Sequence, residues 1–228
     1  MKLLIFSDTH LTARFDQAKY RYLLNIIADA DQVIINGDFW DSYLTTFDEF
    51  INSDWQQLFP VLKQKKAIYI YGNHDPKHLS DDRVYAFSVE QAQSKNIEAD
   101  GLSLRVQHGH QIVMKGNGPK NWLDKLEGRI SGTIEFVLRS ISNRTVNAIL
   151  EPLNNKMKEW ERHHVPHNRI LVCGHTHIQE NAAVQNFINS GVNNYGLGQY
   201  LLVNQGKIEL HSVRYHTPLL NVQVANQI

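Results

Sequence analysis

The sequence predicts an α/β fold, and three features of the chain indicate it. Within the first 71 residues, short apolar runs alternate with helical patterns in the order βαβαβ, which is typical of a parallel sheet covered by helices. After residue 84, short strand candidates follow one another, and a turn at 204–206 joins the last two. Residues 116–167, which show amphipathic helical patterns, interrupt this second series of strands. We therefore expect two sheets packed face to face, with helices outside.

In the first half of the chain, strands and helices alternate in a regular order. The strands are uninterrupted apolar runs, whereas the apolar residues of the helices recur about every 3.6 residues. The expected elements are a strand at 2–6, a helix around 20–27, a strand at 32–35, a helix from about 47 to 63 and a strand at 67–71.

The second half is predicted to consist of short strands and one helical insertion. The expected strands are 97–99, 102–107, 170–173, 183–188, 200–203 and 207–213. The insertion covers 116–167, with apolar stripes over 122–130, 134–141 and 146–160. We expect residues 1–228 to form a single domain. The insertion either packs helix on helix over the main body or forms a lid.

The composition is that of a folded protein without a leader or a membrane span. The chain of 228 residues is 42% hydrophobic and 20% charged, which excludes intrinsic disorder and a coiled coil. Twenty-three basic residues balance twenty-three acidic ones, so no overall positive charge favours nucleic acid. The apolar run at 1–6 is too short for a signal peptide, and no stretch approaches the roughly 20 apolar residues of a span. We expect a cytoplasmic protein.

Five short polar motifs follow predicted strands. They are DTH at 8–10, GDFWD at 37–41, GNHD at 72–75, HGH at 108–110 and GHTH at 174–177. Residues just past the carboxyl ends of neighbouring strands converge in space, so we expect the motifs to meet. Their aspartate, asparagine and histidine side chains suit manganese, iron, cobalt, nickel or zinc, whereas calcium and magnesium prefer oxygen ligands alone. More ligands are present than one tetrahedral site can use, which indicates two divalent metal ions.

These five motifs, in this order, resemble the calcineurin-like metallophosphoesterase superfamily, whose pattern is D-x-H, G-D-x-x-D, G-N-H-[DE], H and G-H-x-H. The resemblance covers nearly the whole chain. It implies a sandwich of two mixed β-sheets flanked by helices, a dinuclear metal site, and hydrolysis of a phosphate ester or anhydride. Among the possible metals, manganese is the first choice. A hydroxide bridging the metals would attack phosphorus in line.

The resemblance also implies a role for each residue of the motifs. The first metal would be held by Asp8, His10 and His177, the second by Asn73, His108 and His175, and Asp38 would bridge the two. His74 would face the phosphate, where it stabilises developing charge or protonates the leaving oxygen, and Asp75 would orient it.

Two further polar residues of the motifs have open roles. Asp41 either hydrogen-bonds a metal ligand or caps the helix expected from residue 47. His110 competes with His108 for the second metal, and we expect it behind the ligands or near the substrate.

The substrate expected is a small phosphate-containing molecule, and two alternatives stay open. The insertion is also similar to that of the pyrophosphohydrolase that cleaves UDP-2,3-diacylglucosamine, where a helical lid shelters acyl chains; that function would bring the insertion into contact with lipid or a membrane surface. That enzyme, however, typically has GNRD and HGD where this chain has GNHD and HGH.

The other alternative is a non-catalytic metal-binding interaction scaffold, although no ligand position is missing. Nucleic acid is not expected as a partner, because no basic groove is evident. The sequence leaves the oligomeric state open.

Overall fold

Two β-sheets form the body of the protein. The computed structural model describes residues 1–114, 132–135, 137–139 and 142–215. The first sheet contains β1 (Leu3–Phe6), β2 (Gln32–Asn36), β3 (Ile68–Ile70), β4 (Glu90–Ala92), β10 (Asn193–Asn194), β11 (Leu197–Asn204) and β12 (Lys207–Arg214). The second contains β5 (Ser94–Ala99), β6 (Leu102–Gln107), β7 (Ile170–Cys173), β8 (Glu180–Ala182) and β9 (Phe187–Asn189).

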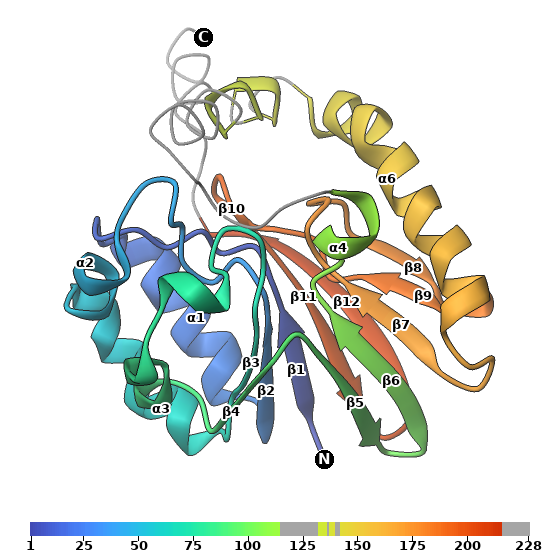
Figure 1. Cartoon of the computed structure of the whole chain (residues 1–228), viewed down its shortest axis with the longest axis horizontal. Helices are drawn as coiled ribbons and strands as arrows, with labels where there is room; N and C mark the ends of the chain where they lie inside the picture. Colours follow the sequence, from blue (N-terminus) through green and yellow to red (C-terminus); the bar gives the residue numbers. More distant parts are fainter. Residues whose placement is uncertain (115–131, 136, 140–141, 216–228) are drawn as a thin grey trace, which may run out of the picture.

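Both sheets are mixed. The strand order of the first is β10-β11-β1-β2-β3-β4, with β12 on β11, and that of the second is β5-β6-β7-β9-β8. The pairs β1–β2, β2–β3 and β3–β4 are parallel, as are β6–β7 and β7–β9, whereas β11 lies antiparallel to β1. Figure 1 shows the two sheets side by side with helices outside each. The predicted α/β sandwich of two mixed sheets is confirmed.

Side chains of β1 alternate between the two faces of the first sheet, and both faces are buried. Leu4 and Phe6 belong to the core formed with α1 (Gln17–Ala28), whereas Leu3 and Ile5 belong to the core between the sheets. A strand covered on both faces has no need of polar residues, which is why it is an uninterrupted apolar run in the sequence.

The single helix predicted over 47–63 is wrong. The structure has α2 (Phe47–Ile51), a 3-10 helix η1 (Asp54–Leu58) and α3 (Phe59–Gln64). Thr46 and Glu49 form a capping box that starts α2, the Ser53 hydroxyl caps η1, and Pro60 stands in the first turn of α3. The three pieces bury a common apolar face, so their sequence keeps a helical period across the breaks.

The single strand predicted over 183–188 is also wrong. β8 ends at Ala182, the 3-10 helix η4 (Ala183–Gln185) follows, and Asn186 adopts a left-handed φ of 54° before β9 begins. The hairpin predicted at 204–206 is present between β11 and β12, with positive φ at Gln205 and Gly206. The other 3-10 helices are η2 (Lys77–Leu79) and η3 (Asp82–Ala86).

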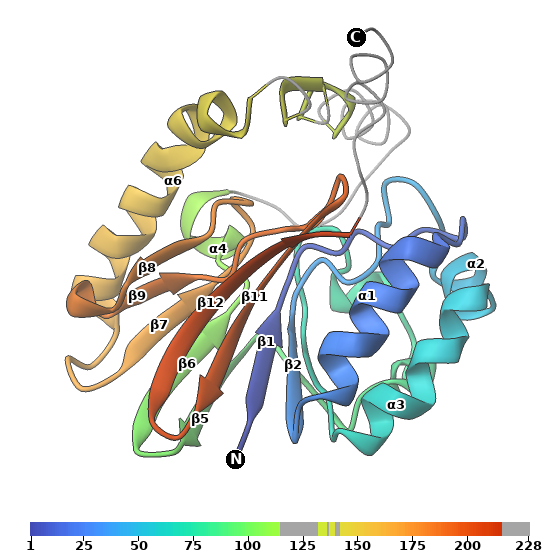
Figure 2. The same cartoon turned by 180° about the vertical axis from the view of Figure 1, so that it is seen from behind.

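The insertion contributes a long helix outside the second sheet. α6 (Asn143–His164) runs along that sheet, and α4 (His110–Val113) lies near it (Figure 2). Met157 of α6 is fully buried and packs with Leu171, Cys173 and Phe187 of the second sheet. The helix predicted at 122–130 lies outside the described residues, and part of the 134–141 stretch is helical. Among the described residues, no helix is both long and apolar enough to cross a membrane.

Replacing Phe87 by alanine should strongly destabilise the first core. Its ring is fully buried and lies 5.2 Å from Phe39, 5.3 Å from Phe59 and 5.3 Å from Tyr69, measured between centroids. Loss of a buried phenylalanine costs about 3–5 kcal/mol, so the urea midpoint should fall markedly. Tyr85→Ala is the control, because this ring is 51% exposed and its loss should cost about 0.5 kcal/mol or less. Equal losses for the two variants would contradict this packing.

Candidate metal centre

The five polar motifs meet where strands of both sheets end. The loops after β1 and β2 are joined by hydrogen bonds from the Asp8 amide to the Gly37 carbonyl (3.0 Å) and from the His10 amide to the Asp38 carbonyl (2.9 Å). The loops after β6 and β7 are joined by a bond from the Gly174 amide to the His108 carbonyl (3.0 Å). The loops thus converge as the parallel strands predict.

Five of the predicted ligands have strained backbones. Their φ angles are 56° at Asp8, 45° at His10, 52° at Asp38, 68° at His175 and 59° at His177. Non-glycine residues rarely adopt this left-handed region, which costs on the order of 1–3 kcal/mol for each residue. Such strain persists where surrounding contacts over-determine the conformation, and it is typical of functional sites.

Asp8, His10 and His177 form the first group of candidate ligands. The Nε2 atom of His177 lies 3.2 Å from Asp8 Oδ1 and 3.1 Å from His10 Nε2. The backbone amide of His175 donates to both oxygens of Asp8, at 3.2 and 3.0 Å. The residues predicted for the first metal are therefore within reach of one ion.

Asp38, His108 and His175 form the second group. The Nε2 atom of His108 lies 3.2 Å from Asp38 Oδ2, and the same oxygen lies 3.9 Å from His10 Nε2. Asp38 thus faces both groups, as a bridging carboxylate would. Asn73 is buried, and its Oδ1 atom accepts no hydrogen bond from the described residues. A buried oxygen without a donor is suited to a cation.

The residues present fit divalent ions. Asp8 and Asp38 are almost completely buried, and ionised carboxylates are stable in such a place only when they are paired or bind metal. Burial opposes charge on the imidazole, but Asp38 and Asp8 outweigh it and raise the pKa of His108 to about 9. The same carboxylates would attract a divalent cation.

In three of the imidazoles, the Nδ1 atom lies close to an oxygen atom of another residue. His108 Nδ1 is 2.8 Å from the Asn36 carbonyl, and His10 Nδ1 is 3.4 Å from Asp41 Oδ2. His177 Nδ1 is 2.7 Å from the carboxylate of Glu135. A proton held on Nδ1 by such a partner leaves the Nε2 lone pair for a metal.

His74 stands beside the first group and is held by Asp41, and these two residues form a third group of possible ligands with His10. Its Nδ1 lies 3.0 Å from Asp41 Oδ1, and its amide donates to Asp38 Oδ1 at 2.8 Å. Its ring centroid is 4.5 Å from that of His10. Burial opposes the charge, but Asp38 and Asp41 outweigh it and raise the pKa of His74 to about 9. The side chain is therefore suited to give a proton at neutral pH.

One expectation about the aspartates is corrected, and of the two roles left open for Asp41 the contact with a candidate ligand is the one found. Asp75 was expected to orient His74, but its carboxylate accepts hydrogen bonds from the amides of Asp38 (3.0 Å), Phe39 (2.6 Å) and Gly72 (2.6 Å). Asp75 thus ties two motif loops together. Asp41 contacts His74 and His10, and Thr46, not Asp41, caps α2.

The structure separates His108 from His110. His108 lies within the group of Asp38 and His175, whereas His110 starts α4 with its ring centroid 5.4 Å from that of His108. His110 is buried and is not a member of any candidate ligand group found among the described residues. Of the two, His108 is the residue placed to bind metal.

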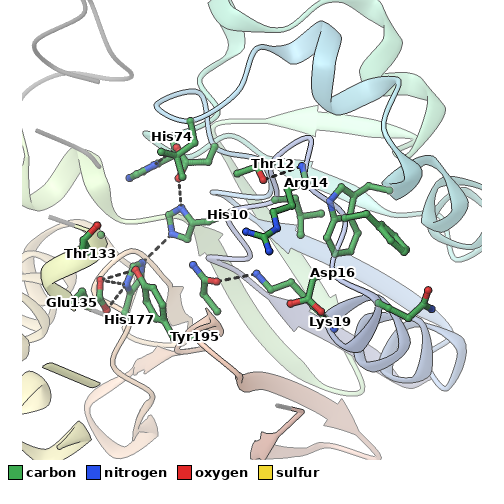
Figure 3. A pocket seen from close by; sticks show the side chains of 18 residues that line it. His10, Thr12, Arg14, Asp16, Lys19, His74, Thr133, Glu135, His177 and Tyr195 are labelled. Atoms are coloured by element: carbon green, nitrogen blue, oxygen red, sulfur yellow. Dashed lines mark hydrogen bonds and ion pairs between the residues drawn. The ribbon is translucent and has the colours of Figure 1, made fainter. Parts of the chain in front are cut away.

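A pocket of about 960 Å³ opens beside His10, His74 and His177. Figure 3 shows these imidazoles on one side and Arg14, Lys19 and neighbouring residues on the other. The remaining lining residues are Leu11, Thr12, Phe15, Asp16, Gln17, Asp41, Leu44, Trp55, Gly132, Thr133, Glu135, Asn194 and Tyr195.

Four charged residues at this site were missed from the sequence, namely Arg14, Lys19, Glu135 and Arg139. None belongs to a motif, and each lies in or near a helical pattern where a charged residue usually faces solvent.

Gly72→Ala should weaken metal binding at least about tenfold, because the added methyl group would displace Asp38 and a ligand binds metal well only when the groups around it hold its position. A Cβ atom at Gly72 would lie 2.5 Å from the Asp38 backbone nitrogen and closer still to Asp38 Oδ1. Titration calorimetry with Mn²⁺ measures the effect. Gly132→Ala is the control, since the nearest atom to its Cβ would be the Tyr195 hydroxyl at 4.0 Å. Unchanged affinity in Gly72→Ala would show that Asp38 is not a ligand.

Comparison with known proteins agrees with the motifs. A family model described as the calcineurin-like phosphoesterase superfamily domain matches residues 1–225. No curated protein matches the chain. Among solved structures, Zn²⁺-bound Vps29 from Entamoeba histolytica is 14% identical with a TM-score of 0.49, covering 95% of this chain and 100% of that chain.

Two further solved structures are similar at low identity. The YfcE phosphoesterase from E. coli is 16% identical with a TM-score of 0.45, covering 95% of this chain and 100% of that chain. A predicted phosphoesterase from Streptococcus pneumoniae is 13% identical with a TM-score of 0.43, covering 94% of this chain and 89% of that chain. On the match over residues 1–225, this chain belongs to the calcineurin-like phosphoesterase superfamily.

Proposed function

We propose that the protein is a dinuclear metal-dependent hydrolase of organic phosphate esters, either phosphodiesters or phosphomonoesters. One observation carries the proposal: Asp38 of the second group lies 3.2 Å from His108 and also 3.9 Å from His10 of the first group, next to a pocket lined by His74. A single structural metal would need neither the second group nor the pocket.

The proposed ligands follow the two groups. Asp8, His10 and His177 would hold one ion, Asn73, His108 and His175 the other, and Asp38 would lie between them. When bound, two divalent ions would supply Lewis-acid stabilisation of the phosphate and activation of a water molecule. Mixed nitrogen and oxygen ligands favour manganese, iron, cobalt, nickel or zinc, and we propose manganese first.

His74 would stabilise or protonate the leaving oxygen. Asp41 holds its Nδ1 atom, so Nε2 is the nitrogen available to a substrate. In the metal-free protein, Asp38 and Asp41 outweigh the effect of burial and raise the pKa of His74 to about 9, which favours the protonated imidazole. An imidazolium beside the phosphate can donate a hydrogen bond or a proton without waiting for solvent.

The pocket favours an organic ester over inorganic pyrophosphate. Its volume of about 960 Å³ lies at the upper end of the range for sites that bind drug-sized ligands. The rings of Phe15 and Tyr195 in its wall suit an apolar or aromatic leaving group. Lys19 and Arg14 add positive charge, and no ion pair of the Arg14 guanidinium is found with the described residues.

Rates measured with Mn²⁺ and after chelation test the proposal. p-Nitrophenyl phosphate, bis-p-nitrophenyl phosphate and UDP-diacylglucosamine are compared side by side. Metal-dependent turnover of either nitrophenyl ester supports the proposal, whereas preferred turnover of the lipid supports the pyrophosphohydrolase alternative. Two bound ions without turnover of any substrate would favour the non-catalytic scaffold.

His74→Ala should lower kcat by about 10²–10⁴-fold for esters with poor leaving groups, because a general acid contributes that much. Nitrophenolate needs little protonation, so its ester should lose far less. His78→Ala is the control, since this histidine is exposed and lies four residues further on. Equal losses for alkyl and nitrophenyl esters would exclude the acid role.

Arg14→Ala should raise KM about tenfold or more and leave kcat nearly unchanged, because a hydrogen bond to a charged group contributes about 1.5–3 kcal/mol. Steady-state kinetics on an anionic ester measure both constants. Arg21→Ala, an exposed arginine of α1 that does not line the pocket, should behave as wild type. A wild-type KM in Arg14→Ala would remove Arg14 from the substrate site.

A further inference from the structure

We infer that the insertion is a built-in part of the metal centre, because three of its residues, Glu135, Arg139 and Asn154, hold the GHTH loop (residues 174–177) in its ligating conformation. The inference rests on the proposed role of His177 as a ligand. It assigns these residues a positioning role and gives the insertion a function other than a lid or simple packing.

Glu135 fixes the imidazole of His177. Its two carboxylate oxygens lie 2.7 and 2.9 Å from His177 Nδ1, although the residues are 42 positions apart. Both oxygens can only accept, so the Nδ1 atom must carry the proton. The Nε2 atom of His177 is then turned towards Asp8 and His10, which are the other members of its group.

Arg139 holds both Glu135 and the backbone of His177. Its Nε donates to Glu135 Oε1 at 2.8 Å, and its Nη2 donates to the His177 carbonyl at 3.0 Å. The arginine side chain is 5% exposed, so these bonds are shielded from water. The insertion therefore contacts His177 at its side chain and at its main chain.

Asn154 holds the residue between the two histidines of the loop. It is fully buried in α6, and the Thr176 hydroxyl donates to its Oδ1 at 2.6 Å. Its Nδ2 donates to the Ile178 carbonyl at 3.4 Å and to Glu180 Oε2 at 2.9 Å. Asn189 of β9 donates to the same Oδ1 at 3.1 Å, so helix, loop and sheet share one buried network.

The GHTH loop requires such support. His175 and His177 both have left-handed φ angles, 68° and 59°, and a relaxed loop would leave that region. Removing a polar partner that orients a ligating histidine typically lowers metal affinity by 10–100-fold. If Glu135 and Arg139 moved away as part of a free lid, they would release His177.

Metal affinity tests the inference directly. Equilibrium dialysis and calorimetry with Mn²⁺ are carried out on wild type, Glu135→Ala and Glu135→Gln. Glu135→Ala should bind the ion of the first group 10–100-fold more weakly, and the second ion should be affected less. Glu135→Gln, whose amide oxygen can still accept from Nδ1, should recover part of the affinity.

The matched control is Glu159→Ala. Glu159 is a glutamate of α6 that lies 3.1 Å from an imidazole nitrogen of His163, but both side chains are more than half exposed and neither residue belongs to a motif. Its loss should leave affinity for both ions unchanged. Wild-type affinity in Glu135→Ala would overturn the inference.

Thr176→Val tests the contact between Thr176 and Asn154 with little change in side-chain volume. It removes the hydroxyl that binds Asn154, and we expect weaker metal binding with retained folding, checked by circular dichroism and by the urea midpoint. Wild-type affinity in Thr176→Val would remove Asn154 from the positioning role.

These measurements do not require turnover. If the wild type binds two ions but hydrolyses no ester, the proposed function fails while the positioning role can still be scored. If the wild type binds no divalent ion, both are overturned.

Discussion

Two buried carboxylates, Asp8 and Asp38, lie where the sheets meet. The groups around them are arranged so that hydrogen-bond donors and imidazoles compensate their negative charge. A buried ionised carboxylate costs several kcal/mol unless partners neutralise it. The backbone amides of His175 and His74 donate to them, and imidazoles approach within 3.2 Å. Divalent ions would complete the compensation, which explains why polar motifs follow strands that are otherwise apolar.

Around these carboxylates, other polar side chains hold the loops in place. Asp75 ties the loops after β2 and β3 through three amides, and Asp41 holds His74 and His10. The insertion supplies comparable support from the second sheet's side through Glu135. The strained φ angles of the candidate ligands persist because each loop is held from more than one direction.

The fold was predictable where a local pattern has one physical cause. β1 and β7 were found because apolar strands buried on both faces leave continuous runs in the sequence, whereas β6 was found because its apolar and polar residues alternate. The helix expected over 47–63 was wrong because the pattern records which face is buried, whereas local capping decides where a helix ends. β4 was missed because its half-buried sequence, Glu-Gln-Ala, shows no strand pattern. This segment becomes a strand because β3 lies beside it and pairs with it.

The sequence by itself determined the fold class, the superfamily and the identity of the candidate ligands, because donor types in a fixed order after strands carry that information locally. Tertiary structure alone decided that Asp41 rather than Asp75 contacts His74, that His108 rather than His110 joins Asp38, and that Glu135 reaches His177. Such contacts join residues far apart in the chain. They depend on the direction in which each side chain leaves a folded backbone, and that direction is set by packing.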